Sequence, residues 1–105
     1  MRNGELYMNI NANLEGNVCT LAVEGKVDTL TAPQFEQTFE EYSEKCDKMI
    51  FDLAKTEYIS SAGLRVILVA HRKMEQKGGL VLKNLNKNVD TIITMTGFRK
   101  KFNIE

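Results

Sequence analysis

The chain of 105 residues has no tryptophan, one proline, one histidine and two cysteines. Two cysteines are too few for a disulfide framework. Cys19 and Cys46 lie in apolar patterns without metal-site spacing, so we expect both to be buried thiols without a redox role. A single proline and 43% hydrophobic residues exclude a disordered or fibrous chain. The length is typical of one domain, so residues 1–105 are predicted to form a single domain.

Long apolar segments and an excess of one charge are also absent. The longest aliphatic run, residues 66–70, is far too short to span a bilayer, and residues 1–9 lack the apolar centre of a signal peptide. We therefore expect a cytoplasmic protein without direct membrane insertion. The formal net charge is zero, so no overall field attracts nucleic acid, and no nucleic-acid partner is expected.

Alternating and continuous apolar patterns predict the strands. Residues 6–14 alternate with the period of a strand that has one buried face, and a tight turn at residues 16–17 leads to a second strand over residues 18–23. Residues 49–53 are typical of a central strand covered on both faces, and residues 58–59 can extend it beyond a kink. Another strand is expected at residues 80–82.

The helical spacing of apolar residues predicts three helices. The first begins near Thr31, which fits a capping box with Gln34. The second runs over residues 61–77 and ends at two glycines. The third is capped by Asn86 and ends at Gly97, before a returning apolar segment.

The resulting order is ββαβαβα, and the last segment allows one more short strand. Right-handed crossovers make successive β-α-β strands parallel, whereas the opening hairpin is antiparallel. An α/β domain is therefore predicted, with a mixed β-sheet and helices packed on it. The loops after the carboxyl ends of strands are the usual functional edge of such sheets. Asp28 and Ser61 both lie in strand-to-helix connections and can share one surface.

A serine pair, Ser60 and Ser61, stands at the predicted start of the second helix. The first N–H groups of a helix have no internal partners and form the positive end of its dipole, so this end favours an anion. On the residues alone, the pair is best interpreted as an N-cap, worth about 1 kcal/mol relative to alanine. A phosphoryl group on Ser61 would also be tolerated there.

Catalytic motifs are missing from the sequence. The single histidine, His71, lies about 15 Å from Ser61 along the same predicted helix and cannot act as its base. Ile59 occupies the place where a hydrolase nucleophile elbow requires glycine. Nucleotide-binding motifs and zinc-ligand spacings do not occur. We therefore expect no enzymatic activity and no metal, and we interpret His71 as a packed, neutral histidine.

Three stretches resemble STAS domains, specifically the anti-sigma-factor antagonists of bacteria. Residues 25–28 with Thr31 and Ala32 resemble the family's first loop and helix start. Residues 60–64, Ser-Ser-Ala-Gly-Leu, resemble its signature, and residues 95–98 resemble the end of its last helix. The matches occur in the right order and cover nearly the whole chain. The resemblance thus implies a STAS-like fold.

The resemblance also implies roles for individual residues. Ser61 aligns with the serine that is phosphorylated by a partner, which is both an anti-sigma factor and a protein kinase. Ser60 stands where an aspartate often precedes that serine, and it is the alternative phosphorylation site. Asp28 aligns with an acidic residue of the partner-binding surface. Asp52 matches an aspartate at the end of the central strand, and we assign it structural support of the loop before Ser61.

By this resemblance, the unphosphorylated chain binds the anti-sigma factor and releases the sigma factor, and phosphorylation of Ser61 stops this. The kinase uses ATP, so the chain itself needs no cofactor, and a phosphatase is expected to restore it. Two valines on the polar side of the second helix extend the docking surface or contact a neighbouring helix. The predicted partner-binding residues are Asp28, Ser60, Ser61, Gly63, Val66 and Val69.

Two other functions stay open at this point. The chain can be a STAS-type accessory subunit of a membrane transporter complex, in which Ser61 serves only as an N-cap. It can also be a small nucleotide-binding STAS module that uses the same helix N-terminus for a free phosphate. The partner that copurifies distinguishes these functions: a soluble kinase, a transporter complex, or a nucleotide alone.

Overall fold

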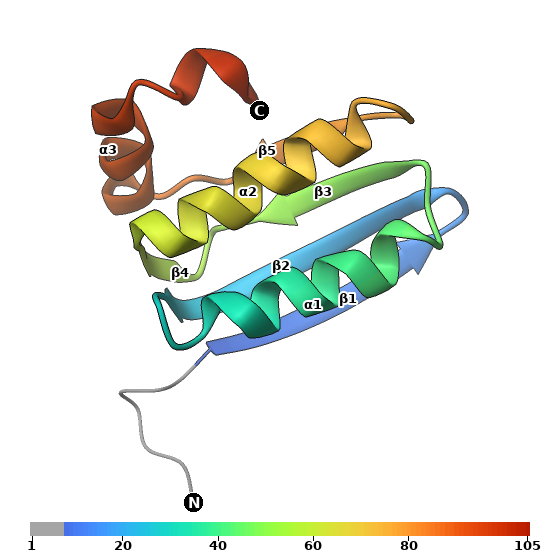
Figure 1. Cartoon of the computed structure of the whole chain (residues 1–105), viewed down its shortest axis with the longest axis horizontal. Helices are drawn as coiled ribbons and strands as arrows, with labels where there is room; N and C mark the ends of the chain where they lie inside the picture. The colour runs from blue at the N-terminus through green and yellow to red at the C-terminus, as the bar shows by residue number, and fades with distance from the viewer. Residues whose placement is uncertain (1–7) are drawn as a thin grey trace, which may run out of the picture.

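The computed structural model describes residues 8–105, and Figure 1 shows the whole chain. The order of elements confirms the predicted ββαβαβα pattern, with β6 as the last short strand. Residues 6–7 of the first predicted strand lie outside the described residues. The elements are β1 (Met8–Glu15), β2 (Val18–Val27), α1 (Ala32–Ser43), β3 (Lys48–Asp52), β4 (Thr56–Ile59), α2 (Ser61–Met74), β5 (Leu80–Lys83), α3 (Lys87–Thr96), the 3-10 turn η2 (Arg99–Lys101) and β6 (Asn103–Ile104).

The six strands of the described part of the chain belong to one sheet, which is mixed, as predicted. The sheet has the order β1-β2-β3-β5-β6, and β4 also pairs with β2. Among the strands of residues 8–105, only β1 and β2 are antiparallel, and they form the expected hairpin. β4 continues β3 along the same side of β2: Asp52 is in register with Ala22 and, after an irregularity, Ile59 is in register with Val27. The predicted extension beyond a kink is therefore confirmed.

α1 and α2 lie side by side on one face of the sheet (Figure 1). The rings of Phe35 and Phe39 from α1 pack against Phe51 of β3, with centroid separations of 5.1 and 6.2 Å. Cys19 and Cys46 are buried free thiols, as predicted. The main hydrophobic core thus fills the space between the sheet and these two helices.

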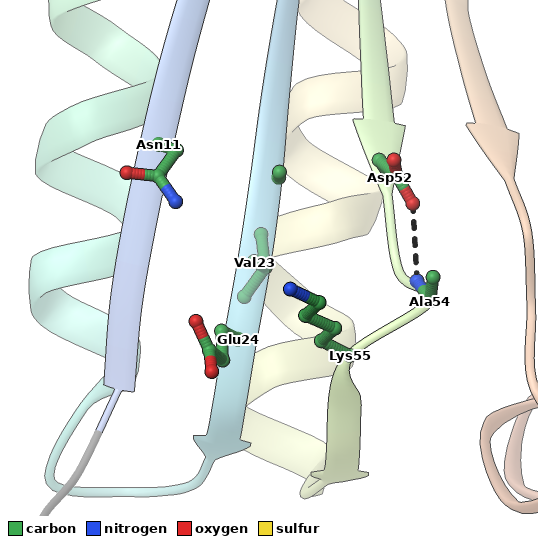
Figure 2. Close-up of a pocket in the computed structure, with 7 residues that line it drawn as sticks. Asn11, Val23, Glu24, Asp52, Ala54 and Lys55 are labelled. Atoms are coloured by element: carbon green, nitrogen blue, oxygen red, sulfur yellow. Dashed lines mark hydrogen bonds between the residues drawn. The ribbon is translucent and has the colours of Figure 1, made fainter.

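The other face of the sheet is open, which corrects one prediction. Met49 and Phe51 of β3 are buried, but Ile50 is only half-buried. Figure 2 views this face, with the helices behind the strands. The apolar run at residues 49–53 was expected in a strand covered on both faces. It instead belongs to a strand with one covered face, because Ile50 points away from α1 and α2.

α3 borders β4 at one end of the sheet. The amide nitrogen of Asn86 donates to the carbonyl of Thr56 at 2.7 Å, and that of Asn88 donates to the carbonyl of Glu57 at 2.7 Å. Asn86 also caps α3, and Gly97 ends it with a left-handed φ of 81°, both as predicted. Within residues 8–105, no helix is long and apolar enough to cross a membrane.

Candidate functional site

Two strand-to-helix junctions meet at one edge of the sheet. β2 ends at Val27 and β4 ends at Ile59, and these residues are in register in a parallel pair. The backbone N–H of Ser60 donates to the carbonyl of Val27 at 2.8 Å, which ties one junction to the other. Asp28 and Ser61 therefore lie on neighbouring strand ends and share one edge of the molecule.

The β2–α1 junction is closed by the side chains of Asp28 and Thr31. Asp28 Oδ1 accepts hydrogen bonds from the N–H of Leu30 at 2.9 Å and of Thr31 at 3.1 Å. The Thr31 hydroxyl donates to the carbonyl of Lys26 at 2.7 Å and accepts from the N–H of Asp28 at 2.9 Å. The predicted capping box with Gln34 is therefore wrong, because Asp28 already binds the N–H of Thr31 and the Thr31 side chain does not cap α1.

These contacts keep Asp28 charged. Burial by itself raises the pKa of Asp28, but hydrogen bonds from the N–H groups of Thr31 and Leu30 outweigh it and hold the pKa below its usual value of 3.8. A carboxylate that accepts backbone hydrogen bonds is stabilised in its ionised form. The edge therefore carries a fixed negative charge at neutral pH.

The β4–α2 junction gives its two serines different roles. Ser60 is the N-cap: its Oγ accepts from the N–H of Gly63 at 3.3 Å, and its carbonyl accepts from the N–H of Leu64 at 2.9 Å. Ser61 is the first residue of α2 and is exposed, and its hydroxyl forms no hydrogen bond within residues 8–105. The capping role thus belongs to Ser60, and the interpretation of Ser61 as only an N-cap is wrong.

Gly63 has a packing role at this junction. A Cβ atom at this position would lie 2.7 Å from Val27 Cγ1, 2.9 Å from Ile59 Cγ2 and 3.1 Å from the carbonyl oxygen of Val27. Only glycine lets α2 approach β2 and β4 this closely. Gly63 is buried, so its assignment to the surface that contacts a partner is corrected.

The prediction that Val66 belongs to the partner-binding surface is also corrected, because Val66 is only 2% exposed and belongs to the hydrophobic core. Lys73 lies two turns further along α2, on the same side as Val66, and its ammonium contacts Glu40 of α1 at 2.7 Å. This side of α2 therefore faces α1. Of the two interpretations offered for Val66, the contact with a neighbouring helix fits the structure, and the exposed docking surface does not. Val69 is half-buried and retains part of its surface.

Asp52 lies apart from the serine pair. Its Oδ1 accepts from the N–H of Ala54 at 3.1 Å and from the amide of Asn84 at 3.1 Å. Figure 2 shows Asp52 on the open face of the sheet, in a depression that Glu24 and Lys55 also line. The carboxylate orders the turn between β3 and β4, and the length of β4 separates it from Ser60.

An apolar groove beside Ser61 was missed by the sequence analysis. Two residues that line the groove are strongly exposed for apolar side chains, Tyr58 at 45% and Met95 at 81%. Leu30, which lies in the β2–α1 junction and does not line the groove, is 70% exposed. The spacing of Ile92 and Met95 on α3 was a weak signal, since only the tertiary structure places α3 beside β4. The groove is lined by Tyr58, Ile59, Ser61, Leu64, Ile92, Met95 and Thr96.

His71 is held by contacts at the other end of α2. Its ring packs edge-on against Phe102, with centroids 5.7 Å apart, and its Nε2 lies 3.4 Å from a carboxylate oxygen of Glu75. The imidazole therefore belongs to the packing between α2 and the C-terminal segment. It lies too far along the helix to serve as a base for Ser61.

Comparison with known proteins agrees with this architecture. The family model of the STAS domain matches residues 9–105. BtrV of Bordetella bronchiseptica, provisionally named an anti-sigma factor antagonist, is 34% identical over 82 residues, which is 76% of this chain and 71% of BtrV. The anti-sigma F factor antagonist of Paenibacillus polymyxa is 26% identical over 89% of this chain and 84% of its own length.

The fold is shared with a solved anti-sigma factor antagonist from Mycobacterium paratuberculosis. The TM-score is 0.85 at 22% sequence identity, and the match covers 94% of this chain and 86% of that structure. The sequence match over residues 9–105 and the shared architecture show that this chain belongs to the STAS domain family.

Proposed function

We propose that this STAS domain is an anti-sigma factor antagonist that is switched by phosphorylation of Ser61. In this proposal, the unphosphorylated form binds an anti-sigma factor that is also a serine kinase, and sigma factor is thereby released. The names of the relatives support the antagonist role. The observation that carries the switch is the exposed hydroxyl of Ser61 at the first residue of α2, without a hydrogen-bond partner in residues 8–105.

Accessibility favours Ser61 over Ser60 as the phosphate acceptor. A kinase must approach the hydroxyl closely and align it with the transferred phosphoryl group. The Ser60 hydroxyl is half-buried and accepts the N–H of Gly63, so its phosphorylation would disrupt the cap of α2. The Ser61 hydroxyl is exposed and can react without loss of an existing contact.

The domain itself should tolerate phosphate at Ser61. The phosphate adds about −1.5 to −2 charges at the positive end of the α2 dipole, where unpaired N–H groups of the first turn can bind its oxygens. The fold therefore stays intact after modification. The switch must act through the surface that a partner contacts.

That surface combines a fixed charge with apolar side chains. Asp28 lies on the neighbouring strand end, and the groove with Tyr58 and Met95 adjoins Ser61. If a partner covers this edge, a phosphate would be desolvated beside an apolar groove and would add like charge to that of Asp28. Each loss of about 1.4 kcal/mol weakens binding tenfold, so a few kcal/mol suffice for a switch. In this proposal the kinase uses ATP as the phosphate donor, a cytoplasmic phosphatase restores the antagonist, and the chain has no catalytic role.

The test is capture of partners from the native host, followed by binding measurements with the purified kinase. We expect wild type and Ser61→Ala to bind the kinase, and Ser61→Asp to bind at least about tenfold more weakly. Phosphate transfer should be lost in Ser61→Ala and retained in the matched control Ser60→Ala. Equal affinity of wild type and Ser61→Asp, or phosphate on Ser60 alone, would contradict the proposed switch. Capture of a transporter ATPase or a bound nucleotide alone would support one of the other two functions.

A further inference from the structure

β1 is an edge strand without the usual protection against pairing. Among the described residues it pairs only with β2, it contains no proline, and its one charged residue, Glu15, is the last residue of the strand. Natural sheets usually block exposed edges with charges, prolines, bulges or very short strands. The opposite edge of this sheet fits that rule, because β6 has only two residues. β1 has eight residues and a regular ladder with β2.

The ladder determines which backbone groups of β1 point away from the sheet. A two-residue turn joins Glu15 to Val18, so these residues form a hydrogen-bonded pair, and every second pair along the hairpin is of this type. The N–H of Gly25 donates to Lys55 on the far side of β2, so Gly25 does not bond to its β1 partner Met8. Both observations show that outward N–H and C=O groups belong to Met8, Ile10, Ala12 and Leu14.

We propose that β1 pairs with β1 of a second copy of this chain, antiparallel about a two-fold axis at Asn11. In this register Met8 faces Leu14 of the second copy, and Ile10 faces Ala12. Within residues 8–15 no other register pairs all four outward residues of each copy with outward residues of the other. The same strand serves both copies, as a closed two-fold interface requires.

The side chains agree with this register. Leu14 is 43% exposed and Ala12 is exposed, and pairing would place them beside Met8 and Ile10 on the side of the sheet that faces the helices. Asparagines would align on the open face, where Figure 2 shows Asn11 on β1. Asn11 would face Asn11 of the second copy, so neutral amides meet at the axis and no charge is buried.

The pairing leaves the α2 junction uncovered. β1 lies at the edge of the sheet away from α2, with β2 and α1 between them (Figure 1). Phosphorylation and partner binding at Ser61 are therefore independent of it, and failure of one proposal does not affect the other. A single edge strand buries less surface than a standard interface, so the dimer is weak and needs high protein concentration.

Sedimentation equilibrium of the full chain from about 10 μM to about 1 mM tests the dimer. We expect reversible dimerisation of wild type and at least about tenfold weaker association of Asn11→Lys and Asn11→Asp separately, because like charges meet at the axis. An equimolar mixture of the two variants should restore dimers, since lysine then faces aspartate. Thr20→Lys, on the same face of β2, is the control and should associate like wild type.

A cross-link tests the register directly. With Asn11→Cys, two thiols at the axis should form an interchain disulfide while one oxidised glutathione is reduced to two glutathione thiols. Asn13→Cys should not cross-link, because it would face Asn9 of the second copy. A wild type that stays monomeric over the whole range, a mixture that fails to restore dimers, or equal cross-linking of both variants would overturn the proposal.

Discussion

The two strand-to-helix junctions at the functional edge differ in how they use their polar side chains. In the β2–α1 junction, both Asp28 and Thr31 are committed to backbone partners. In the β4–α2 junction, Ser60 alone caps the helix, and the Ser61 hydroxyl stays outside the hydrogen-bond network of residues 8–105. One junction is therefore closed by its own contacts, and the other presents an exposed hydroxyl.

This difference indicates that the two neighbouring junctions have different roles in the proposed switch. A phosphorylation site works as a switch only if the acceptor can change without loss of the fold, and if its surroundings stay in place to present the change. In the proposed switch, the Asp28 junction would supply the fixed surroundings and Ser61 the group that changes. Substitutions that act on one junction at a time test this difference.

The largest effect is expected from Gly63→Ala, which pushes the two junctions apart. The new Cβ would lie 2.7 Å from Val27 Cγ1 and 3.1 Å from the Val27 carbonyl oxygen. We expect the free energy of unfolding in urea to fall by about 1–3 kcal/mol, even after the higher helix propensity of alanine. The cost should shrink in a Val27→Ala background, where Cγ1 is absent. A cost that is unchanged by Val27→Ala would contradict the proposed contact.

Asp28→Ala should destabilise the closed junction by about 1–2 kcal/mol at pH 7, because two N–H groups lose their acceptor. Asp28→Asn keeps an acceptor oxygen and should cost less. The pKa of Asp28 is lowered from 3.8, so its charge stabilises the fold above that pH. This contribution is lost as pH falls through the lower folded-state pKa.

Urea unfolding at pH 7 and at pH 3 checks this pH dependence. The stability difference between wild type and Asp28→Asn should be smaller at pH 3, where the wild-type carboxyl takes up protons. A difference that grows on acidification would show that the ionised carboxylate does not stabilise the junction.

Ser60→Ala should cost about 1 kcal/mol, since α2 loses its only side-chain cap within the described residues. Ser60→Asp is the control, because aspartate is an equally good N-cap and should retain most of the stability. Thermal unfolding of the three proteins measures both effects. Equal losses in both variants would assign the contribution of Ser60 to something other than the cap.

The smallest effect is expected at Ser61. Ser61→Ala should change stability by less than about 0.5 kcal/mol, because its hydroxyl has no contact to lose in residues 8–105. Ser61→Asp should raise stability by about 0.3–1 kcal/mol at low salt through the α2 dipole, and the gain should shrink with added salt. A destabilised Ser61→Asp would contradict the idea that the fold tolerates phosphate there.

Local patterns predicted the elements well because each carries its own signal. The hairpin follows from alternation around Gly16 and Asn17, and α3 follows from the Asn86 cap and the Gly97 end. The start of α2 was predicted at the correct residue. The shared edge of Asp28 and Ser61 followed from the topology of parallel strands, which places their carboxyl ends together.

Features that depend on neighbouring elements could not be predicted. The Thr31 capping box failed because Asp28, three residues earlier, competes for the same N–H. Val66 has the helical position of a surface residue, yet it is buried in the hydrophobic core. The groove beside Ser61 requires α3 to lie against β4, and no periodicity in either segment carries that information.

The ties between α1 and α2 are concentrated at one end of the helix pair. The ammonium of Lys77 reaches the carbonyls of Ser43 and Cys46, and Lys73 bridges Glu40 and Glu44. At the other end, where the two junctions lie, no side-chain hydrogen bond or ion pair joins α1 to α2 within residues 8–105, and the two junctions are linked by the backbone hydrogen bond from Ser60 to Val27. Side-chain contacts therefore join α1 and α2 near their carboxyl ends and leave the first turn of α2, where Ser61 lies, without a side-chain hydrogen bond to α1 within residues 8–105.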